Sequence, residues 1–280
     1  MFVSIKNFCY RLWYHIKQKR MGKIMSYTLI TGVTSGIGLA LAREFAEHGS
    51  SLILVARRTD AVAKVVKELK EKYPSQNFES IIIDLSKEHA GEDLYLQVVE
   101  SGYEVDTLVN NAGIGYVGKY ETISMADYEE MMRINMGTVA ATCHAFIPML
   151  KRNGGGILNV ASNGAFHPGP YTANYYATKA YVLHLSEGIR MELKKDGVKV
   201  CALCPGATVS DFCRKAGKRQ IKGSMSAEAV AKAAYRGYMR NKAVIIPGIM
   251  NKVYMIAPRK LRSFAIYISQ QKLATNRRPD

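Results

Sequence analysis

Two side chains on one predicted helix have the chemistry of a proton donor and its activator. Tyr175 and Lys179 stand four residues apart in the segment Tyr-Tyr-Ala-Thr-Lys, so they share one face of a helix. A free tyrosine hydroxyl titrates near ~10, which is too high for easy proton exchange at neutral pH. A nearby ammonium favours the phenolate and lowers that pKa, so the pair could serve as a general acid and base. Tyr176 is the nearest rival, but the residue four positions beyond it is Ala180, which offers no ammonium.

Two more polar residues strengthen this interpretation. A Tyr-x-x-x-Lys pair alone is common and usually marks only a helix surface. Here Ser162 follows directly after a predicted strand over 157–161, and Asn135 lies in a long predicted helix over 124–150. Together the four side chains predict a proton-handling site.

A glycine-rich turn predicts a phosphate-binding site in the same chain. The segment 31–38 reads Thr-Gly-Val-Thr-Ser-Gly-Ile-Gly and joins a short apolar strand to a helix. Glycines let the backbone approach a pyrophosphate, and the helix N-terminus supplies free N–H groups and partial positive charge. Placed after the first strand, the turn favours a dinucleotide over a purely structural role. The predicted contacts are Gly32, Thr34, Ser35, Gly36, Ile37 and Gly38.

The end of the second predicted strand indicates which dinucleotide binds. A site for NAD(H) would place a carboxylate there to bind the ribose hydroxyls. This chain has Arg57 and Arg58 instead, and two guanidinium groups suit a 2′-phosphate. The pair favours NADP(H), while Asp60 keeps NAD(H) as the alternative.

The elements that must position these residues alternate along the chain. Apolar strands are predicted at 27–31, 51–56, 78–83, 105–110, 157–161, 198–204 and 243–246, with helices at 36–48, 60–73, 87–100, 124–150, 174–195 and 227–240. Continuous apolar strands covered by helices are typical of a parallel sheet buried on both faces. We therefore predict an α/β fold, a doubly wound (Rossmann) sheet of about seven parallel strands with helices on both faces. In such a sheet, ligands bind beyond the carboxyl ends of the strands, where the polar residues above fall.

The whole set of motifs resembles the short-chain dehydrogenase/reductases, in their shorter single-domain branch. The resemblance covers roughly 26–248 and rests on motifs in the family's order: the turn 31–38, Asp84-Leu85, Asn110-Asn111-Ala112-Gly113, Asn135, Ser162, Tyr175 with Lys179, and Pro205-Gly206. Such a protein transfers a hydride between carbon 4 of a nicotinamide and a carbonyl carbon, and the chemistry needs no metal.

The resemblance implies a role for each matched residue. Tyr175 would protonate the substrate oxygen, Ser162 would hydrogen-bond it, Lys179 would activate Tyr175 and hold the nicotinamide ribose, and Asn135 would support a water-mediated proton path to Lys179. Asp84 and Leu85 would lie beside the adenine. Asn111, Ala112, Gly113, Pro205 and Gly206 would line the cofactor cleft. Near the nicotinamide amide the chain offers Thr208 and Ser210, of which we favour Thr208.

Charge and cysteine content limit the other classes of function. The net charge is +16, but residues 26–239 carry 24 basic and 22 acidic residues, so the main body is almost neutral. That balance argues against a nucleic-acid-binding protein. The five cysteines are too few for a disulfide scaffold, which favours a reducing cytoplasm. Cys201 and Cys204 form a lone C-x-x-C on a predicted buried strand, so we interpret them as core residues.

The two ends and one internal segment leave alternatives open. Residues 1–25 form a basic extension with apolar residues at helical spacing, which suits a helix on an anionic membrane surface. Alternatively, translation begins at Met21 or Met25. The basic segment 211–223 could attract an acidic carrier or a lipid headgroup, or it could be a solvated lid. The helical tail 249–280 could cover an apolar substrate, pack on a partner subunit or touch lipid.

These observations lead to one functional hypothesis. We expect an extension over 1–25, a reductase domain over 26–248 and a tail over 249–280. The reductase would use NADP(H) on a hydrophobic carbonyl or secondary alcohol, such as an oxoacyl compound, in a homo-oligomer that is cytoplasmic, with membrane contact through its basic ends. The alternative is a non-catalytic protein that senses a dinucleotide on the same fold.

Overall fold

The structure, a computed structural model, describes residues 25–209 and 223–274, with side chains up to residue 271. The predicted helix in residues 1–25, the candidate Ser210 and nearly all of the basic segment 211–223 lie outside the described residues.

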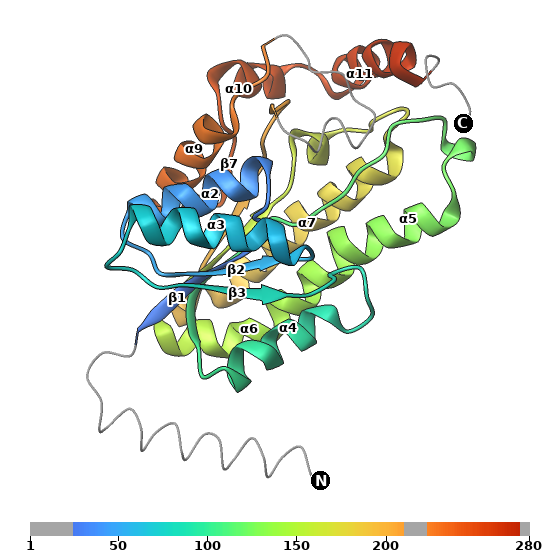
Figure 1. The fold of residues 1–280 in the computed structure, drawn as a ribbon. Coiled ribbons are helices and arrows are strands. Elements are labelled where there is room, and N and C mark those ends of the chain that lie inside the picture. Colours follow the sequence, from blue (N-terminus) through green and yellow to red (C-terminus); the bar gives the residue numbers. More distant parts are fainter. Residues whose placement is uncertain (1–24, 210–222, 275–280) are drawn as a thin grey trace.

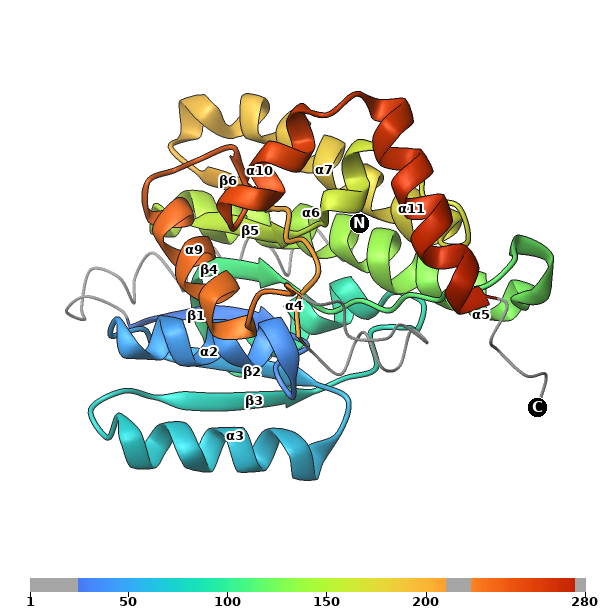
Figure 2. The same cartoon turned by 90° about the horizontal axis from the view of Figure 1, so that it is seen from above.

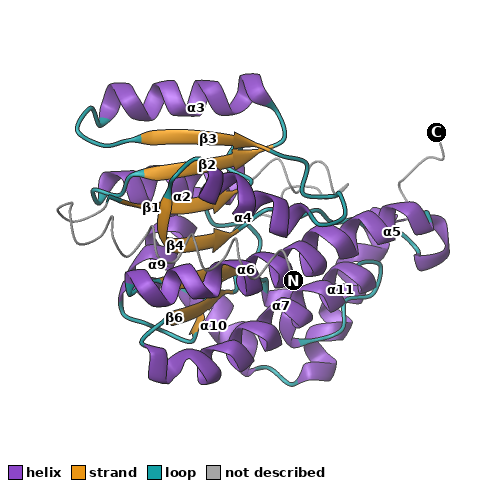
Figure 3. Ribbon diagram, turned by 90° about the horizontal axis from the view of Figure 1, so that it is seen from below, coloured by secondary structure: helices purple, strands orange, loops and turns teal. Residues whose placement is uncertain are grey.

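A seven-stranded parallel sheet forms the centre of the fold (Figures 1 and 3). Its strands are β1 (Ser26–Thr31), β2 (Leu52–Ala56), β3 (Phe78–Ile82), β4 (Glu104–Asn110), β5 (Gly156–Val160), β6 (Lys199–Leu203) and β7 (Val244–Ile245). Their order is β3-β2-β1-β4-β5-β6-β7, so the chain winds outward in both directions from β1 and β4. The predicted doubly wound fold is confirmed.

Helices bury both faces of this sheet. One face is covered by α2 (Gly36–Glu47), α3 (Thr59–Lys72) and α9 (Ala227–Met239), and the other by α4 (Ala90–Glu100), α6 (Thr138–Asn153) and α7 (Ala173–Glu192). Because side chains alternate along a strand, neighbouring apolar residues enter different cores. Leu29 of β1, for example, packs with α4 and α6, while Ile30 packs with α2.

The predicted helix over 124–150 is divided in the structure. Helix α5 (Met125–Met132) runs into a π-helical turn over Arg133–Gly137, and α6 then continues. A π turn holds one more residue per hydrogen-bonded ring than an α turn, so it shifts which side chains face inward. Asn135 lies in this turn and is fully buried.

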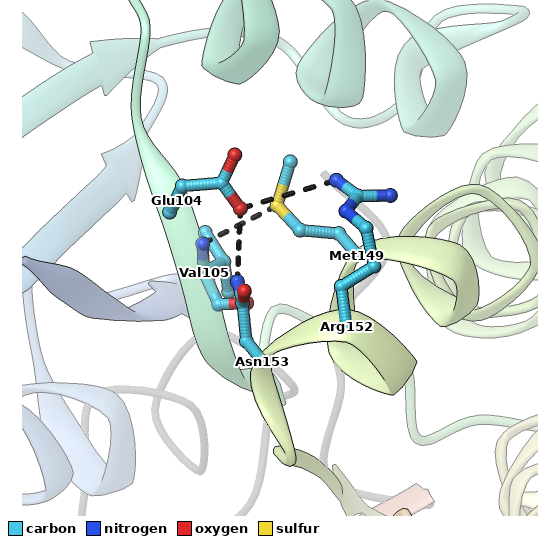
Figure 4. Close-up of polar contacts among 5 residues, drawn as sticks. All are labelled: Glu104, Val105, Met149, Arg152 and Asn153. Atoms are coloured by element: carbon cyan, nitrogen blue, oxygen red, sulfur yellow. Dashed lines mark hydrogen bonds and ion pairs between the residues drawn. The ribbon is translucent and has the colours of Figure 1, made fainter. Parts of the chain in front are cut away.

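At the amino ends of the strands, α6 is fastened to β4 (Figure 4). The Asn153 side-chain amide donates hydrogen bonds to the buried Glu104 carboxylate, at 2.9 Å, and to the carbonyl oxygen of Val105, at 3.0 Å. Arg152 lies 3.9 Å from the same carboxylate. These contacts fix the helix end far from the carboxyl edge of the sheet, where the candidate site residues lie.

Two further helices follow β7 at one end of the molecule (Figures 1 and 2). They are α10 (Ile249–Ile256) and α11 (Arg259–Ala274). The Tyr254 ring lies 5.8 Å from that of His167, and the Tyr267 ring stacks 5.9 Å from that of Tyr171. The tail therefore rests on the loop between β5 and α7. Within the described residues, no helix is both long enough and apolar enough to span a bilayer.

Candidate active site

The glycine turn between β1 and α2 has a backbone that requires glycine. Gly32 and Gly36 adopt positive φ angles of 71° and 56°, a region that disfavours side chains. A Cβ atom on Gly38 would lie 2.1 Å from the carbonyl oxygen of Gly32. Ser35 precedes α2 without a side-chain cap, and the first turn of the helix holds no acidic residue. The turn thus presents a free helix N-terminus, which fits the pyrophosphate of a dinucleotide.

Asn111 and Thr31 hold this turn against the end of β4. The Asn111 side-chain amide donates to the carbonyl oxygens of Thr31, at 2.8 Å, and Gly32, at 3.1 Å. The Thr31 hydroxyl accepts from the backbone N–H groups of Asn111 and Ala112, at 2.9 and 3.0 Å. The role of Asn111 seen here is therefore to lock two loops together beneath the cleft.

Tyr175, Lys179 and Ser162 line one cavity with the glycine turn. Lys179 is buried and donates from Nζ to the carbonyl oxygen of Val160 at 2.8 Å. Its Nζ lies 5.9 Å from the centre of the Tyr175 ring. Burial lowers the pKa of Lys179 to about 8, because the charged form is poorly solvated there. The Ser162 hydroxyl accepts from the backbone N–H of Gly164 at 3.1 Å and can still donate.

Asn135 does not line the cavity but supports its wall. Its side chain accepts from the backbone N–H of Ile114 at 3.0 Å and donates to the carbonyl oxygen of the same residue at 2.9 Å. It also donates to the Thr178 hydroxyl at 3.1 Å. The π turn therefore ties the loop after β4 to α7, beside Lys179.

The end of β2 supplies positive charge to the other end of the cavity. Arg57 and Arg58 are exposed and line it, as do Asp84 and Leu85 after β3. Burial raises the pKa of Asp84, but hydrogen bonds from Ser86 and the charge of Arg57 outweigh this and leave it below the ordinary value. A carboxylate and two guanidinium groups therefore stand where an adenosine end would be recognised.

The cavity has a volume of about 650 Å³ and brings together every predicted cofactor contact. Gly113, Pro205, Gly206 and Thr208 line it together with the residues described above. Our predicted contacts did not include its wall from the tail, namely Asn251, Tyr254, Ile266, Ser269 and Gln270. Only the amphipathic spacing of the tail pointed to such a covering role.

Tyr176 and the C-x-x-C pair have structural surroundings. The Tyr176 ring packs against Gly164 and Gly169, and burial raises its pKa to about 12. Cys201 and Cys204 are buried, and burial raises their pKa values to about 11 and about 12. Both cysteines therefore remain neutral thiols at neutral pH, which disfavours metal or redox chemistry.

Comparison with known proteins identifies the family. A family model described as short chain dehydrogenase matches residues 26–221. The chain belongs to this family. Members are oxidoreductases, and the expected family membership is confirmed. The family match ends before α9, α10 and α11, so the helical tail that covers the cavity lies outside it.

Curated relatives of the chain carry the names of different reductases. The chain is 33% identical over 187 residues to sulfoacetaldehyde reductase 2 of Chromohalobacter salexigens, covering 66% of this chain and 73% of the relative. It is 34% identical over 194 residues to a very-long-chain 3-oxoacyl-CoA reductase-like protein of Arabidopsis thaliana, covering 67% of this chain and 61% of the relative.

Solved short-chain dehydrogenase structures match most of the chain. One from Sphingobium yanoikuyae in complex with NADPH has a TM-score of 0.75 and 28% identity, covering 90% of this chain and 96% of that one. A 3-ketoacyl-(acyl-carrier-protein) reductase of Brucella melitensis complexed with NADH has a TM-score of 0.69 and 27% identity, covering 80% and 96%. Nicotinamide dinucleotides are thus bound on this fold by both relatives.

Proposed function

We propose that this protein is an NADP(H)-dependent oxidoreductase that reduces a hydrophobic carbonyl compound or oxidises the corresponding alcohol. The observation that carries the proposal is the shared cavity: Tyr175, Ser162 and Lys179 line the same space as the glycine turn. The phenol of Tyr175, the hydroxyl of Ser162 and the buried amine of Lys179 thus line a cavity whose glycine turn fits a pyrophosphate. A protein that only senses a dinucleotide has no need of the first three groups.

In the proposed reaction, the residues of this chain handle the proton and the orientation. The bound nicotinamide supplies or accepts the hydride. Ser162 donates a hydrogen bond to the substrate oxygen, which fixes the carbonyl beside Tyr175. The hydroxyl of Tyr175 gives its proton to that oxygen during reduction, and the ammonium of Lys179 stabilises the phenolate that results. Asn135 acts as a positioning residue, because it holds the Ile114 backbone and Thr178 next to this pair.

The preference for NADP(H) rests on Arg57 and Arg58. The two side chains line the cavity at the end of β2, where an NAD(H) site carries a carboxylate. Guanidinium groups pair with phosphate oxygens through charge-assisted hydrogen bonds, so a 2′-phosphate is favoured there. The structures of the relatives with NADPH and NADH leave both cofactors open for the family.

The substrate class is proposed from the remaining wall of the cavity. Ile114, Tyr116, Tyr254 and Ile266 line it, together with the polar side chains of Glu130, His167, Asn251, Ser269 and Gln270. This mixture suits an apolar chain with a polar group near the carbonyl, and 3-oxoacyl thioesters have this chemistry. Two relatives bear the names of 3-oxoacyl or 3-ketoacyl reductases, which supports the same class.

The proposal is tested by following NADPH oxidation with a panel of ketones, aldehydes and 3-oxoacyl thioesters. Tyr175→Phe should reduce kcat by at least about 100-fold, the lower range for general acid–base catalysis. Binding of NADPH, measured by its fluorescence, should persist. The matched control is Tyr176→Phe, which removes the adjacent hydroxyl and should retain most of the turnover. Normal turnover by Tyr175→Phe would refute the assigned role. Binding of NADPH without turnover of any carbonyl by the wild type would favour the sensing alternative.

A further inference from the structure

The outer faces of α10 and α11 are unusually apolar. Eight of the seventeen exposed large apolar side chains in the described part of the chain lie on these two helices. Ile249, Val253 and Ile256 form a stripe along α10 with exposed fractions of 78%, 52% and 83%. On α11, Leu261, Phe264 and Ile268 repeat the spacing, with Phe264 61% exposed. Contiguous exposed apolar surface of this kind marks an interaction site.

The opposite face of α11 is already occupied. Ile266 and Gln270 line the cavity, and Gln270 is only 3% exposed. Tyr254 of α10 also lines the cavity and donates a hydrogen bond to the carbonyl oxygen of Arg262 at 3.2 Å. The inner face therefore closes the cavity, while the side chains of the outer stripes remain exposed, with the Phe264 ring stacked on Tyr267 of the same helix.

Charge indicates which partner fits these stripes. No acidic residue occurs between Glu228 and Asp280, whereas residues 240–279 contain nine lysines and arginines. Lys252, Arg259 and Lys260 are exposed on α10 and α11, beside the apolar residues. A helix with exposed apolar residues flanked by cationic side chains is the pattern of a segment lying on an anionic lipid surface.

A second copy of the chain fits this surface poorly. A two-fold interface places the same patch of each copy against the other. Lys252, Arg259 and Lys260 would then face like charges, with no carboxylate on either helix to offset them.

We propose that α10 and α11 dock peripherally on an anionic lipid bilayer, with their outer stripes in the headgroup region. The cavity wall formed by their inner faces would then lie at the membrane surface. Peripheral contact agrees with the absence of a described helix long and apolar enough to cross a membrane. The proposal goes beyond the oxidoreductase function, and its test requires no turnover. If the reductase function also holds, a substrate with a long apolar chain would reach the cavity from the lipid.

The experiment is flotation of the full-length protein with lipid vesicles. The wild type should float with vesicles that contain phosphatidylglycerol and stay behind with pure phosphatidylcholine, and high salt should weaken the binding. The pair Ile256→Asp and Phe264→Asp should lower the partition coefficient by at least about 100-fold, because two apolar side chains no longer enter the membrane. The matched control is Leu96→Asp with Met191→Asp, which charges two residues of similar exposure on other helices and should leave flotation unchanged.

A second pair tests the charges without adding acids to the apolar stripes. Lys252→Gln with Lys260→Gln should lower partitioning about 25-fold, since each surface lysine contributes about fivefold. The control is Lys64→Gln with Lys70→Gln on α3. Thermal unfolding verifies that each variant is folded, and light scattering reports its mass. Absence of flotation by the wild type overturns the proposal. Equal flotation of the α10 and α11 variants and their control variants also overturns it. The same holds if an α10 or α11 variant changes the oligomeric mass but still floats like the wild type.

Discussion

The ammonium nitrogen of Lys179 lies 5.9 Å from the centre of the Tyr175 ring, inside the protein rather than at its surface. Its described hydrogen-bond acceptor is the carbonyl oxygen of Val160, at 2.8 Å. A neutral carbonyl compensates only part of the lost hydration of an ammonium, and burial lowers the pKa of Lys179 to about 8. The proposed catalytic position of Lys179 therefore costs the fold stability.

The first prediction concerns how the stability lost by burying the Lys179 ammonium depends on pH. The unfolded chain binds the Lys179 proton up to about 10.5, while the folded chain loses it near 8. Below pH 8 both states are protonated and the fold carries the full penalty, about 3 kcal/mol for this shift. The penalty disappears as pH rises from 8 to 10.5, because there the unfolded state binds more protons. Lys179→Met should thus raise the free energy of unfolding at pH 7 by about 2–3 kcal/mol, and this advantage should shrink by pH 10.

Urea unfolding at several pH values measures this effect, and NADPH oxidation should be lost in the same variant. Lys232→Met on the exposed surface of α9 is the control and should show no such pH-dependent difference. If Lys179→Met were less stable than the wild type at pH 7, the ammonium would be better compensated than its described contacts indicate.

The second prediction compares two helical glycines. A Cβ atom on Gly38 would lie 2.1 Å from the Gly32 carbonyl oxygen and 2.3 Å from Asn111 Nδ2. Gly38→Ala should therefore destabilise the fold by about 1–3 kcal/mol through overpacking and weaken NADPH binding. A Cβ atom on Gly188 of α7 would meet nothing within 4 Å, so Gly188→Ala should stabilise the protein by up to about 1 kcal/mol. Equal melting temperatures for the two variants would contradict the close approach.

The strands and the glycine turn could be predicted because their signals are local. Runs such as residues 52–56 are apolar throughout, and a strand buried on both faces requires that composition. The glycine positions of 31–38 likewise follow from one turn geometry. The glycine turn and the arginines at 57 and 58 could be placed at one site because the carboxyl ends of parallel strands meet at one edge. The contacts from Asp84 to Thr208 were named instead from the resemblance to the family, and other lining residues, such as Ile114 and His167, were not predicted.

Other parts of the site carry no comparable signal. The π turn at Arg133–Gly137 interrupts a helix without a proline or a break in the apolar pattern, so the sequence predicted one helix over 124–150. The tail has apolar residues on both faces of α11, and periodicity alone does not tell Ile266, which lines the cavity, from Ile268, which is exposed. The two faces are distinguished only in the fold, where Gln270 is buried at the cavity and Tyr267 packs on Tyr171 of the loop before α7.

The third prediction tests the choice of cofactor. Arg57→Ala and Arg58→Ala remove the two guanidinium groups that line the cavity at the end of β2. Loss of a hydrogen bond to a charged group costs about 1.5–3 kcal/mol, so kcat/KM for NADPH should fall about 10- to 100-fold in at least one variant. The value for NADH should change little. Lys64→Ala, further along α3, is the control for a general loss of positive charge. Equal losses for both nucleotides, or a wild type that prefers NADH, would contradict the assignment.

The last prediction concerns Gln270, which reaches the cavity from α11. Its side chain is 3% exposed, and its Oε1 atom has no hydrogen-bond partner among the described residues. A buried unpaired carbonyl oxygen costs about 1–3 kcal/mol, and that penalty is relieved when a bound substrate supplies a donor such as an amide N–H. Gln270→Leu should therefore raise the melting temperature and raise KM for an oxoacyl-CoA about fivefold, with KM for NADPH unchanged. The control is Gln97→Leu on α4, which does not line this cavity and should leave KM for the oxoacyl-CoA unchanged. A rise in KM without any gain in stability would mean that Gln270 is already paired before the substrate arrives, because only an unpaired amide makes stability and substrate affinity change in opposite directions.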